Sequence, residues 1–275
     1  MSNNFAKNIS TGIARRVEKT FSNTYKKAGL SWPKEIIVKH LPQYGYQTIR
    51  LLGKPFSFYE RDGFLHSLKE IFVEDIYLQQ LPRGARIIDC GSNIGLSVIY
   101  LKKLCPDAHI IAFEPDERNF KLLEKNVHSF NLTNTELRKE AIWTENTYLD
   151  FSNKGTLGSK IVGENGNDKN TIKVKTTRLK DLLTRKIDFL KLDIEGAEYA
   201  VLKDIADNIH FAEKIFIEYH GTYSQNSELN EIFELIISKG FHYYIKEAYN
   251  NPTPFTSVPS PDGFDIQLNI FCVKT

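Results

Sequence analysis

Short apolar runs alternate with amphipathic stretches from residue 85 onward. Runs that suit buried strands fall at residues 86–90, 109–113, 135–140, 187–193 and 214–219. Apolar residues at helical spacing follow at residues 95–104, 117–130, 198–208 and 228–238. Alternating strands and helices predict a doubly wound, mostly parallel sheet of the α/β class, in which ligands bind at the carboxyl ends of the strands.

The last part of the chain adds two strands to this pattern, near residues 241–246 and 267–274, joined by a loop rich in Pro and Gly. One helix followed by two closing strands suits a seven-stranded sheet with an antiparallel last strand. Residues 147–178 depart from the alternation and predict an inserted β ribbon with a polar tip at 155–170. We therefore expect one large domain over residues 63–275.

The first 62 residues differ in pattern and in charge. Residues 46–60 predict a β-hairpin that turns at Gly53-Lys54, and residues 66–80 predict a helix after it. Residues 1–41 suggest basic helices that end near Trp32-Pro33. We expect an N-terminal extension over residues 1–62. Its basic arm, residues 1–41, has four alternatives: a substrate lid, an arm that forms a homo-oligomer, a helix on a membrane surface, or a solvated helix packed on the main domain.

Charge and composition narrow the possible functions. Residues 1–50 hold nine Lys and Arg against two acids, but the whole chain has a net charge of only +2, which argues against nucleic acid as the general partner. No apolar run approaches transmembrane length, and residues 1–30 lack the apolar centre of a signal peptide. Three cysteines without paired spacing predict reduced, buried thiols in a cytoplasmic protein.

The strongest chemical signal follows the first strand of the alternating region. That strand ends in Asp89-Cys-Gly-Ser-Asn-Ile-Gly, and the next one ends in Phe113-Glu-Pro. A dinucleotide site needs G-x-G-x-x-G for an anionic pyrophosphate, whereas these glycines have G-x-x-x-G spacing and follow a carboxylate. Asp89 suits the ammonium and sulfonium charges of S-adenosylmethionine (SAM), and Glu114 is placed to accept both ribose hydroxyls. The pattern favours SAM over NAD.

These positions give the expected cofactor pocket. Asp89, Gly91 and Asn93 should line the methionine end, Ala141 at the end of the third strand should border the adenine, and Glu70 should close the methionine side. The full expected set is Glu70, Asp89, Gly91, Ser92, Asn93, Gly95, Glu114, Pro115, Ala141 and Asp193.

A second group of polar residues ends the fourth and fifth strands. Side chains alternate along a strand, so Lys191 shares a face with Asp193, and Glu218 shares one with His220. A lysine in a central parallel strand is buried and needs a carboxylate partner or a task. His220, Asp193 and Lys191 are therefore candidates for a general base. A purely structural ion pair and a surface histidine are the alternatives.

The same region offers a possible metal site. Asp193, Glu195 and His220 form a potential ligand set for a divalent cation, with Mg²⁺ or Mn²⁺ favoured because the donors are rich in oxygen. Such an ion would acidify a hydroxyl group.

Four of these segments together resemble the FkbM family of SAM-dependent methyltransferases: Asp89-Cys-Gly-Ser-Asn-Ile-Gly, Phe113-Glu-Pro, Lys191-Leu-Asp-Ile-Glu-Gly-Ala-Glu and Glu218-Tyr-His. The resemblance covers roughly residues 64–245 and departs from the family at Lys180, where Asp is common. It implies a class I methyltransferase (Rossmann-like) fold and O-methylation of a small-molecule or glycan acceptor, often a sugar hydroxyl or another natural-product alcohol.

Three other functions remain as alternatives. An NAD-linked oxidoreductase shares the fold but not the glycine spacing or Asp89. A nucleic-acid methyltransferase would explain the basic arm, yet the fourth strand ends in Asp-Ile-Glu-Gly and not in the Asn/Asp-Pro-Pro-Tyr run expected for base amino groups. A non-catalytic module with a vestigial pocket is the third, and the intact acids argue against it.

Overall fold

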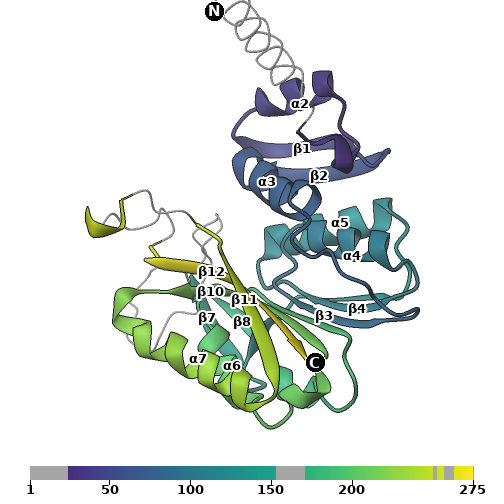
Figure 1. Cartoon of the computed structure of the whole chain (residues 1–275). Coiled ribbons are helices and arrows are strands. Elements are labelled where there is room, and N and C mark those ends of the chain that lie inside the picture. Colours follow the sequence, from purple (N-terminus) through teal and green to yellow (C-terminus); the bar gives the residue numbers. More distant parts are fainter. Residues whose placement is uncertain (1–23, 153–170, 250–252, 257–262, 275) are drawn as a thin grey trace, which may run out of the picture. The chain divides into compact units, whose positions relative to one another are not determined.

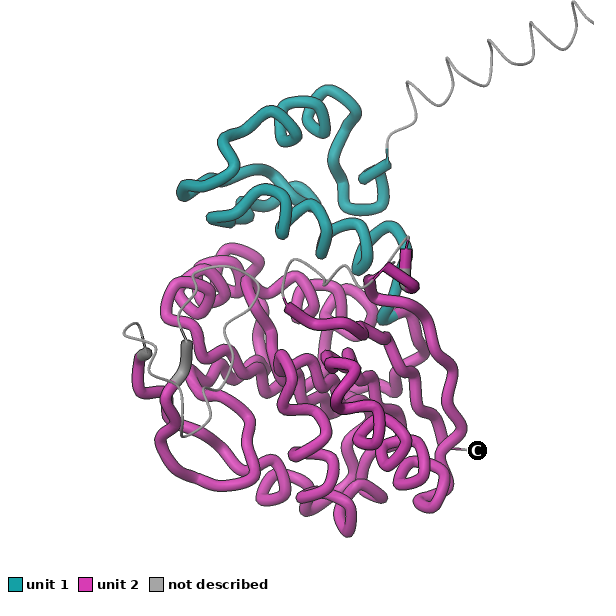
Figure 2. Tube along the Cα trace, turned by 90° about the vertical axis from the view of Figure 1, so that its left-hand side faces the viewer, with its two compact units in different colours: residues 1–77 teal, residues 78–275 magenta. Residues whose placement is uncertain are grey.

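A computed structural model describes residues 24–152, 171–249, 253–256 and 263–274. The chain divides into two compact units, residues 1–77 and residues 78–275 (Figure 2). The domain boundary expected at residue 62 falls inside the first of these units.

The first unit is built around a β-hairpin, in which β1 (Tyr44–Leu51) pairs antiparallel with β2 (Lys54–Glu60). A 3-10 turn η1 (Lys26–Ala28) and helix α2 (Trp32–Lys39) precede it, and helix α3 (Arg61–Leu68) and a π-helical turn η2 (Lys69–Val73) follow. The hairpin turns at Leu52-Gly53, one residue before the predicted position. Both turn residues have positive φ angles, 48° and 81°, as a two-residue type I′ turn requires.

Two helix predictions in this unit are wrong. A helix was expected to end near Trp32-Pro33, but α2 begins there, because the fixed φ and missing N–H of proline suit the first turn of a helix. The helix expected over residues 66–80 starts at Arg61 and stops at Val73, and Asp75 then takes a left-handed φ of 53° that no helix can continue. Residues 1–23 of the predicted basic arm lie outside the described residues.

The second unit contains the predicted seven-stranded sheet, in the order β11-β12-β10-β9-β3-β4-β5 (Figure 1). Its strands are β3 (Arg86–Cys90), β4 (His109–Phe113), β5 (Thr135–Arg138), β9 (Phe189–Leu192), β10 (Lys214–Gly221), β11 (Phe241–Glu247) and β12 (Ile266–Lys274). The pairs β3–β4, β4–β5, β3–β9 and β9–β10 are parallel, and β12 runs antiparallel to both of its neighbours. The α/β fold class and the antiparallel last strand are therefore confirmed.

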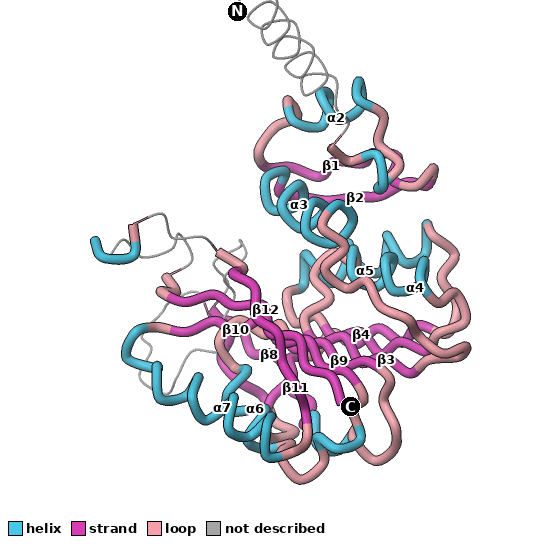
Figure 3. The backbone as a smooth tube through the Cα atoms, in the orientation of Figure 1, coloured by secondary structure: helices cyan, strands magenta, loops and turns pink. Residues whose placement is uncertain are grey.

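Helices cover both faces of this sheet (Figure 3). Helices α4 (Leu96–Leu104) and α5 (Glu117–Ser129) lie on one face, and α6 (Glu198–Asp204) and α7 (Asn226–Ser238) lie on the other. Short 3-10 turns complete the described elements: η3 (Leu179–Leu182), η4 (Ile209–Phe211), η5 (Tyr223–Gln225) and η6 (Pro254–Thr256). Strand residues such as Leu190 and Ile217 pack with Val201 and Ile236 of the helices in one buried core, which fixes the ends of the strands where polar groups gather.

A smaller sheet interrupts the alternation, with the order β6-β8-β7. It consists of β6 (Ala141–Trp143), β7 (Tyr148–Ser152) and β8 (Thr171–Arg178). Strands β7 and β8 pair antiparallel within the region expected to form a ribbon, and its polar tip, residues 155–170, lies outside the described residues. Ala141 was expected to end the third strand of the main sheet, and this prediction is wrong. That strand, β5, ends at Arg138, and Ala141 begins β6 of the smaller sheet.

Composition led to predictions about the cysteines and about membrane-spanning segments. The three cysteines, Cys90, Cys105 and Cys272, are all buried and free of disulfides, as their spacing predicted. None of the described helices is long and apolar enough to cross a membrane.

Candidate active site

The turn between β3 and α4 depends on residues with a left-handed backbone. Gly91, Asn93 and Gly95 have φ angles of 91°, 46° and 93°. A Cβ atom on Gly91 would lie only 1.8 Å from the backbone oxygen of Asp193, so this position requires glycine for the close approach of two chain segments. The N–H groups of Gly91 and Ser92 donate to the carbonyl of Phe113 at 3.1 and 2.8 Å, which ties the turn to the end of β4.

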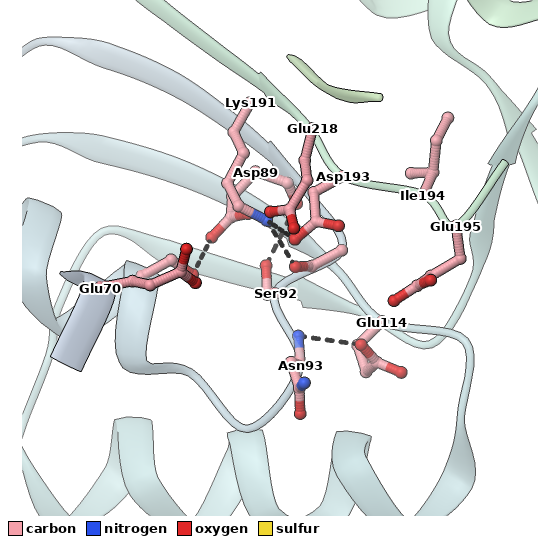
Figure 4. Close-up of polar contacts among 12 residues, drawn as sticks. Glu70, Asp89, Ser92, Asn93, Glu114, Lys191, Asp193, Ile194, Glu195 and Glu218 are labelled. Carbon is pink, nitrogen blue, oxygen red and sulfur yellow. Dashed lines mark hydrogen bonds and ion pairs between the residues drawn. The ribbon is translucent and has the colours of Figure 1, made fainter. Parts of the chain in front are cut away.

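Glu114, directly after β4, holds the same turn through its side chain (Figure 4). Its Oε2 accepts the N–H of Asn93 at 2.9 Å, the contact drawn in Figure 4. Its Oε1 accepts the N–H of Asp116, also at 2.9 Å. Burial raises the pKa of Glu114 to about 8, against the lowering effect of these two hydrogen bonds. Each carboxylate oxygen can accept a further hydrogen bond, so Glu114 can receive the hydroxyl groups of a ligand.

Asp89 and Lys191 form a buried ion pair on the two central strands, with Lys191 Nζ 3.3 Å from Asp89 Oδ1. The lysine also donates to the carbonyl of Gly91 at 2.7 Å and to Asp193 Oδ2 at 3.0 Å. The other oxygen of Asp89 accepts the Ser97 hydroxyl at 2.6 Å. The buried lysine thus has the carboxylate partners that its position required. Asp89 is fully buried, and its predicted contact with the methionine end of the cofactor stays a prediction.

Acidic side chains gather with His220 where β9 and β10 end. The side chains of Asp193, Glu195 and Glu218 are 24%, 28% and 20% exposed, whereas that of His220 is only 5% exposed. His220 Nε2 lies 3.7 Å from Glu218 Oε1 and 3.8 Å from Glu195 Oε2. The shared faces predicted from strand alternation, for Lys191 with Asp193 and for Glu218 with His220, agree with these distances.

Glu198 is a site residue that the sequence did not reveal. Its fully buried carboxylate accepts the N–H of Ile194 at 3.0 Å and that of Gly196 at 3.1 and 3.2 Å, and it lies 3.4 Å from His220 Nδ1. In the sequence it looked like an ordinary acid at a helix N-terminus. Its contact with His220 depends on β10 lying beside β9, and no local sequence pattern predicts that these two strands are neighbours. Phe264 packs on the same histidine, with a ring-centroid distance of 5.0 Å.

Charge around His220 decides its protonation. Burial alone would lower the pKa of His220, but the hydrogen bond to Glu198 and the negative charges of Glu198, Glu195 and Glu218 raise it well above its ordinary value. In the protonated form both ring nitrogens are donors, and the ring cannot accept a proton. Asp193, partly exposed and close by, is therefore the better placed of the expected bases.

Three further residues expected in the cofactor pocket lie on other parts of the chain. Glu70 lies on η2 in the first unit, Ala141 on β6 and Pro115 directly after Glu114. Their expected contacts with a cofactor stay predictions.

A separate cavity lies at the opposite ends of β3, β4 and β5. Its lining includes Arg86, His109 and Arg185, which stand at or near the amino ends of the strands. Ligands of open α/β sheets bind at the carboxyl ends, so we do not assign this cavity to the reaction.

The sheet order, the glycine turn and the acid after β4 together define a class I methyltransferase. A family model described as "Methyltransferase FkbM domain" matches residues 89–243, which is more than half of the chain. The protein belongs to the FkbM methyltransferase family and is a methyltransferase. The fold and the family support SAM as its methyl donor.

Several known proteins are similar to this chain. Methyltransferase 1 of Beauveria bassiana (strain ARSEF 2860) is 28% identical over 169 residues, which cover 52% of this chain and 67% of that protein. Methyltransferase sdnD of Sordaria araneosa is 27% identical over 228 residues, covering 69% and 86%. The crystal structure of methyltransferase FkbM from Methylobacillus flagellatus KT aligns with a TM-score of 0.46 and 19% identity, over 70% of this chain and 45% of that one.

Proposed function

We propose that the protein transfers a methyl group from SAM to a hydroxyl group of a sugar, a glycan or another natural-product alcohol. The observation that carries this proposal is the group of partly exposed carboxylates, Asp193, Glu195 and Glu218, at the ends of β9 and β10. Carboxylates accept hydrogen bonds from neutral hydroxyl groups, which sugars present in number, and they repel anionic acceptors such as nucleic-acid phosphates.

The residues of the turn fit SAM. Gly91 and Asn93 bring backbone to the carboxyl end of β3 without a Cβ clash at position 91, and Glu114 offers carboxylate oxygens for ribose hydroxyls. When bound, SAM supplies a methyl group on a sulfonium, which is already an excellent leaving group. We assign Asp89 a supporting role, because it is buried and acts on the turn through Lys191 and Ser97.

The chain's own part in catalysis is to align the acceptor and to remove its proton. Holding the acceptor oxygen in place is a large share of what such an enzyme must do. Asp193 accepts the proton of the acceptor hydroxyl. Because the Asp193 side chain is partly exposed, it can release this proton to solvent. Lys191, whose Nζ lies 3.0 Å from Asp193 Oδ2, keeps the Asp193 carboxylate in position.

Calorimetry with the full chain tests the cofactor pocket. SAM and its demethylated product should bind with micromolar affinity, NADH should not bind, and Glu114→Ala should weaken SAM binding at least about 10-fold through loss of the ribose contact. Glu117→Ala, an exposed acid three residues later, is the matched control and should bind normally. Unchanged affinity in Glu114→Ala would remove the ribose assignment.

Transfer of a labelled methyl group tests the acceptor class. The panel contains alkyl glycosides, nucleotide sugars, amino sugars, DNA and RNA, and the methylated atom is located by NMR. Methyl groups on a hydroxyl oxygen of a glycoside or alcohol are the expected result. Transfer to nitrogen or to nucleic acid would contradict the proposal, and SAM binding without transfer to any panel member would favour a non-catalytic module.

A further inference from the structure

We propose that Asp193, Glu195 and His220 form a binding site for one divalent cation of the Mn²⁺ type. This inference rests on the proposed function, because the ion's task would be to activate the acceptor hydroxyl. Among the described residues, these three side chains are the one group of potential metal ligands whose donor atoms converge, with all of those atoms within 4.8 Å of one another.

The spacing of the donor atoms fits a shared ion better than direct hydrogen bonds. An ion about 2.1 Å from each donor separates two neighbouring donors by roughly 3 Å and two opposite donors by roughly 4.2 Å. His220 Nε2 lies 3.8 Å from Glu195 Oε2 and 3.7 Å from Glu218 Oε1. Both distances exceed hydrogen-bond reach and lie within the range that an ion would impose. Glu218 can therefore stand in the outer shell or join the ligands.

A buried histidine that points one nitrogen into the group is the second observation. The His220 side chain is 5% exposed, and its Nδ1 is directed to Glu198 at 3.4 Å, which leaves Nε2 facing the carboxylates. Histidine ligands of metals usually have their other ring nitrogen fixed by such a carboxylate. Only a deprotonated ring nitrogen binds a metal, so the ion would displace the Nε2 proton of His220 to water as it binds. Glu198 is itself held by the N–H groups of Ile194 and Gly196, so the ring orientation is set before any ion arrives.

The charges of the site also point to a cation. Asp193, Glu195, Glu198 and Glu218 bring four carboxylates together, and Lys191 is shared with the buried Asp89. In the free protein, protonated His220 and the shared Lys191 offset only part of this negative charge, and a divalent cation in place of the His220 proton would offset more of it. The side chains of Asp193 and Glu195 remain partly exposed, which leaves room for an acceptor oxygen on the ion.

The donor types select the kind of ion. Carboxylate oxygens suit Mg²⁺, Ca²⁺ and Mn²⁺, whereas imidazole suits the transition metals, so Mn²⁺ meets both preferences. An acceptor hydroxyl bound to the ion would lose its proton more readily. Its O–H bond breaks, the electron pair stays on oxygen, and the proton passes by way of the Asp193 carboxylate to water. The oxygen is then ready to form a bond to the methyl carbon as the carbon–sulfur bond breaks and sulfur keeps the electron pair.

Binding of Mn²⁺ alone tests the site without relying on activity. Mn²⁺ is titrated into chelator-treated full-length protein, and the free ion is followed by its EPR signal. One ion per chain should bind with micromolar affinity. Glu195→Gln and His220→Gln should each weaken binding at least about 10-fold, and Glu198→Gln should do the same through the orientation of His220.

Matched controls separate loss of the site from loss of the fold. Glu124→Gln and His128→Gln change exposed residues of α5 and should bind Mn²⁺ as the unmodified protein does. Glu195 is a partly exposed loop residue, so Glu195→Gln should keep the melting temperature and SAM affinity and remains informative where His220→Gln unfolds.

Two results would overturn the inference. One is Mn²⁺ binding in the unmodified protein that does not reach micromolar affinity, and the other is micromolar binding that Glu195→Gln leaves unchanged. Normal SAM binding and methyl transfer in chelator-treated protein would remove the ion's task in the reaction and leave the binding site to be judged by these two results. Failure of the unmodified protein to bind SAM would instead remove the proposed function.

Discussion

The candidate site has two halves, the turn after β3 and the ends of β9 and β10, and different groups fix the geometry of each. Around the turn after β3, geometry is fixed mainly by backbone groups: glycines with positive φ, N–H groups of residues 91–93 and a single acid, Glu114. Where β9 and β10 end, geometry is fixed by charged side chains that meet only because the two strands are neighbours. Lys191 joins the halves, since it donates both to the Gly91 carbonyl and to Asp193. The backbone half therefore tolerates little change of shape, and the side-chain half tolerates little change of charge.

The largest effect should come from Gly91→Ala in the backbone half. The new Cβ would lie 1.8 Å from the Asp193 backbone oxygen, at a φ of 91° that alanine rarely adopts. We expect a loss of more than about 4 kcal/mol in the free energy of unfolding, measured by urea denaturation, because backbone hydrogen bonds hold both segments, from Gly91 to Phe113 and from Asp193 to Cys90. SAM binding should disappear with it.

Gly84→Ala is the matched control for backbone conformation alone. Gly84 also has a positive φ, 66°, but a Cβ there meets nothing within 4 Å. It should lose only about 1 kcal/mol. Equal losses in the two variants would show that the close approach of Gly91 to Asp193 has no energetic role.

The next largest loss of stability should come from removing the charge of Lys191, the residue that joins the two halves. Lys191→Met leaves the fully buried Asp89 without its cation, and removing one partner of a buried pair is expected to lower the free energy of unfolding by about 3 kcal/mol. The double variant Asp89→Asn/Lys191→Met removes both charges and should recover more than about 1 kcal/mol of that loss. A double variant whose loss equals the sum of the single losses would mean that the two charges do not interact.

The same contrast explains what the sequence could predict. The boundaries of β3 and β4, the glycine turn and Glu114 follow from local spacing, and the structure places them as expected. Strand alternation also identified the pairs Lys191–Asp193 and Glu218–His220. The roles of Ser97 and Glu198 were missed, because each depends on a partner that only the tertiary fold supplies. Helix boundaries in the first unit failed where a single proline or left-handed residue outweighed the apolar pattern.

A smaller effect should appear in the pH dependence of cofactor binding. Burial raises the pKa of Glu114 to about 8, so below that pH its carboxyl is mostly protonated in the free protein. Ribose hydroxyls donate to the ionised form, whose fraction rises from about 1% at pH 6 to about 90% at pH 9, so affinity for the demethylated cofactor should rise by up to about 90-fold over this range and level off above the pKa. Calorimetry at pH 6, 7, 8 and 9 measures this.

Glu114→Gln should flatten that profile, whereas Glu117→Gln should keep it. The sign for stability is opposite to that for binding. A carboxyl whose pKa is raised on folding stabilises the fold fully below the unfolded pKa, and this contribution is lost as pH rises toward 8. An affinity that falls between pH 6 and pH 9 would contradict the ribose role of Glu114.

The smallest effect should be the difference in stability between two serine variants. One serine hydroxyl donates to the charged side chain of Asp89, and the other donates to the backbone carbonyl of the same residue. Ser97 donates to the Asp89 carboxylate at 2.6 Å, and Ser92 donates to the Asp89 backbone carbonyl at 3.1 Å; both serines are buried. Hydrogen bonds to charged groups contribute about 1.5–3 kcal/mol and neutral ones about 0.5–1.5 kcal/mol. Ser97→Ala should therefore lose about 1 kcal/mol more than Ser92→Ala in urea denaturation. If Ser92→Ala were the more damaging, the backbone carbonyl and not the charge of Asp89 would be the group that holds the turn to α4.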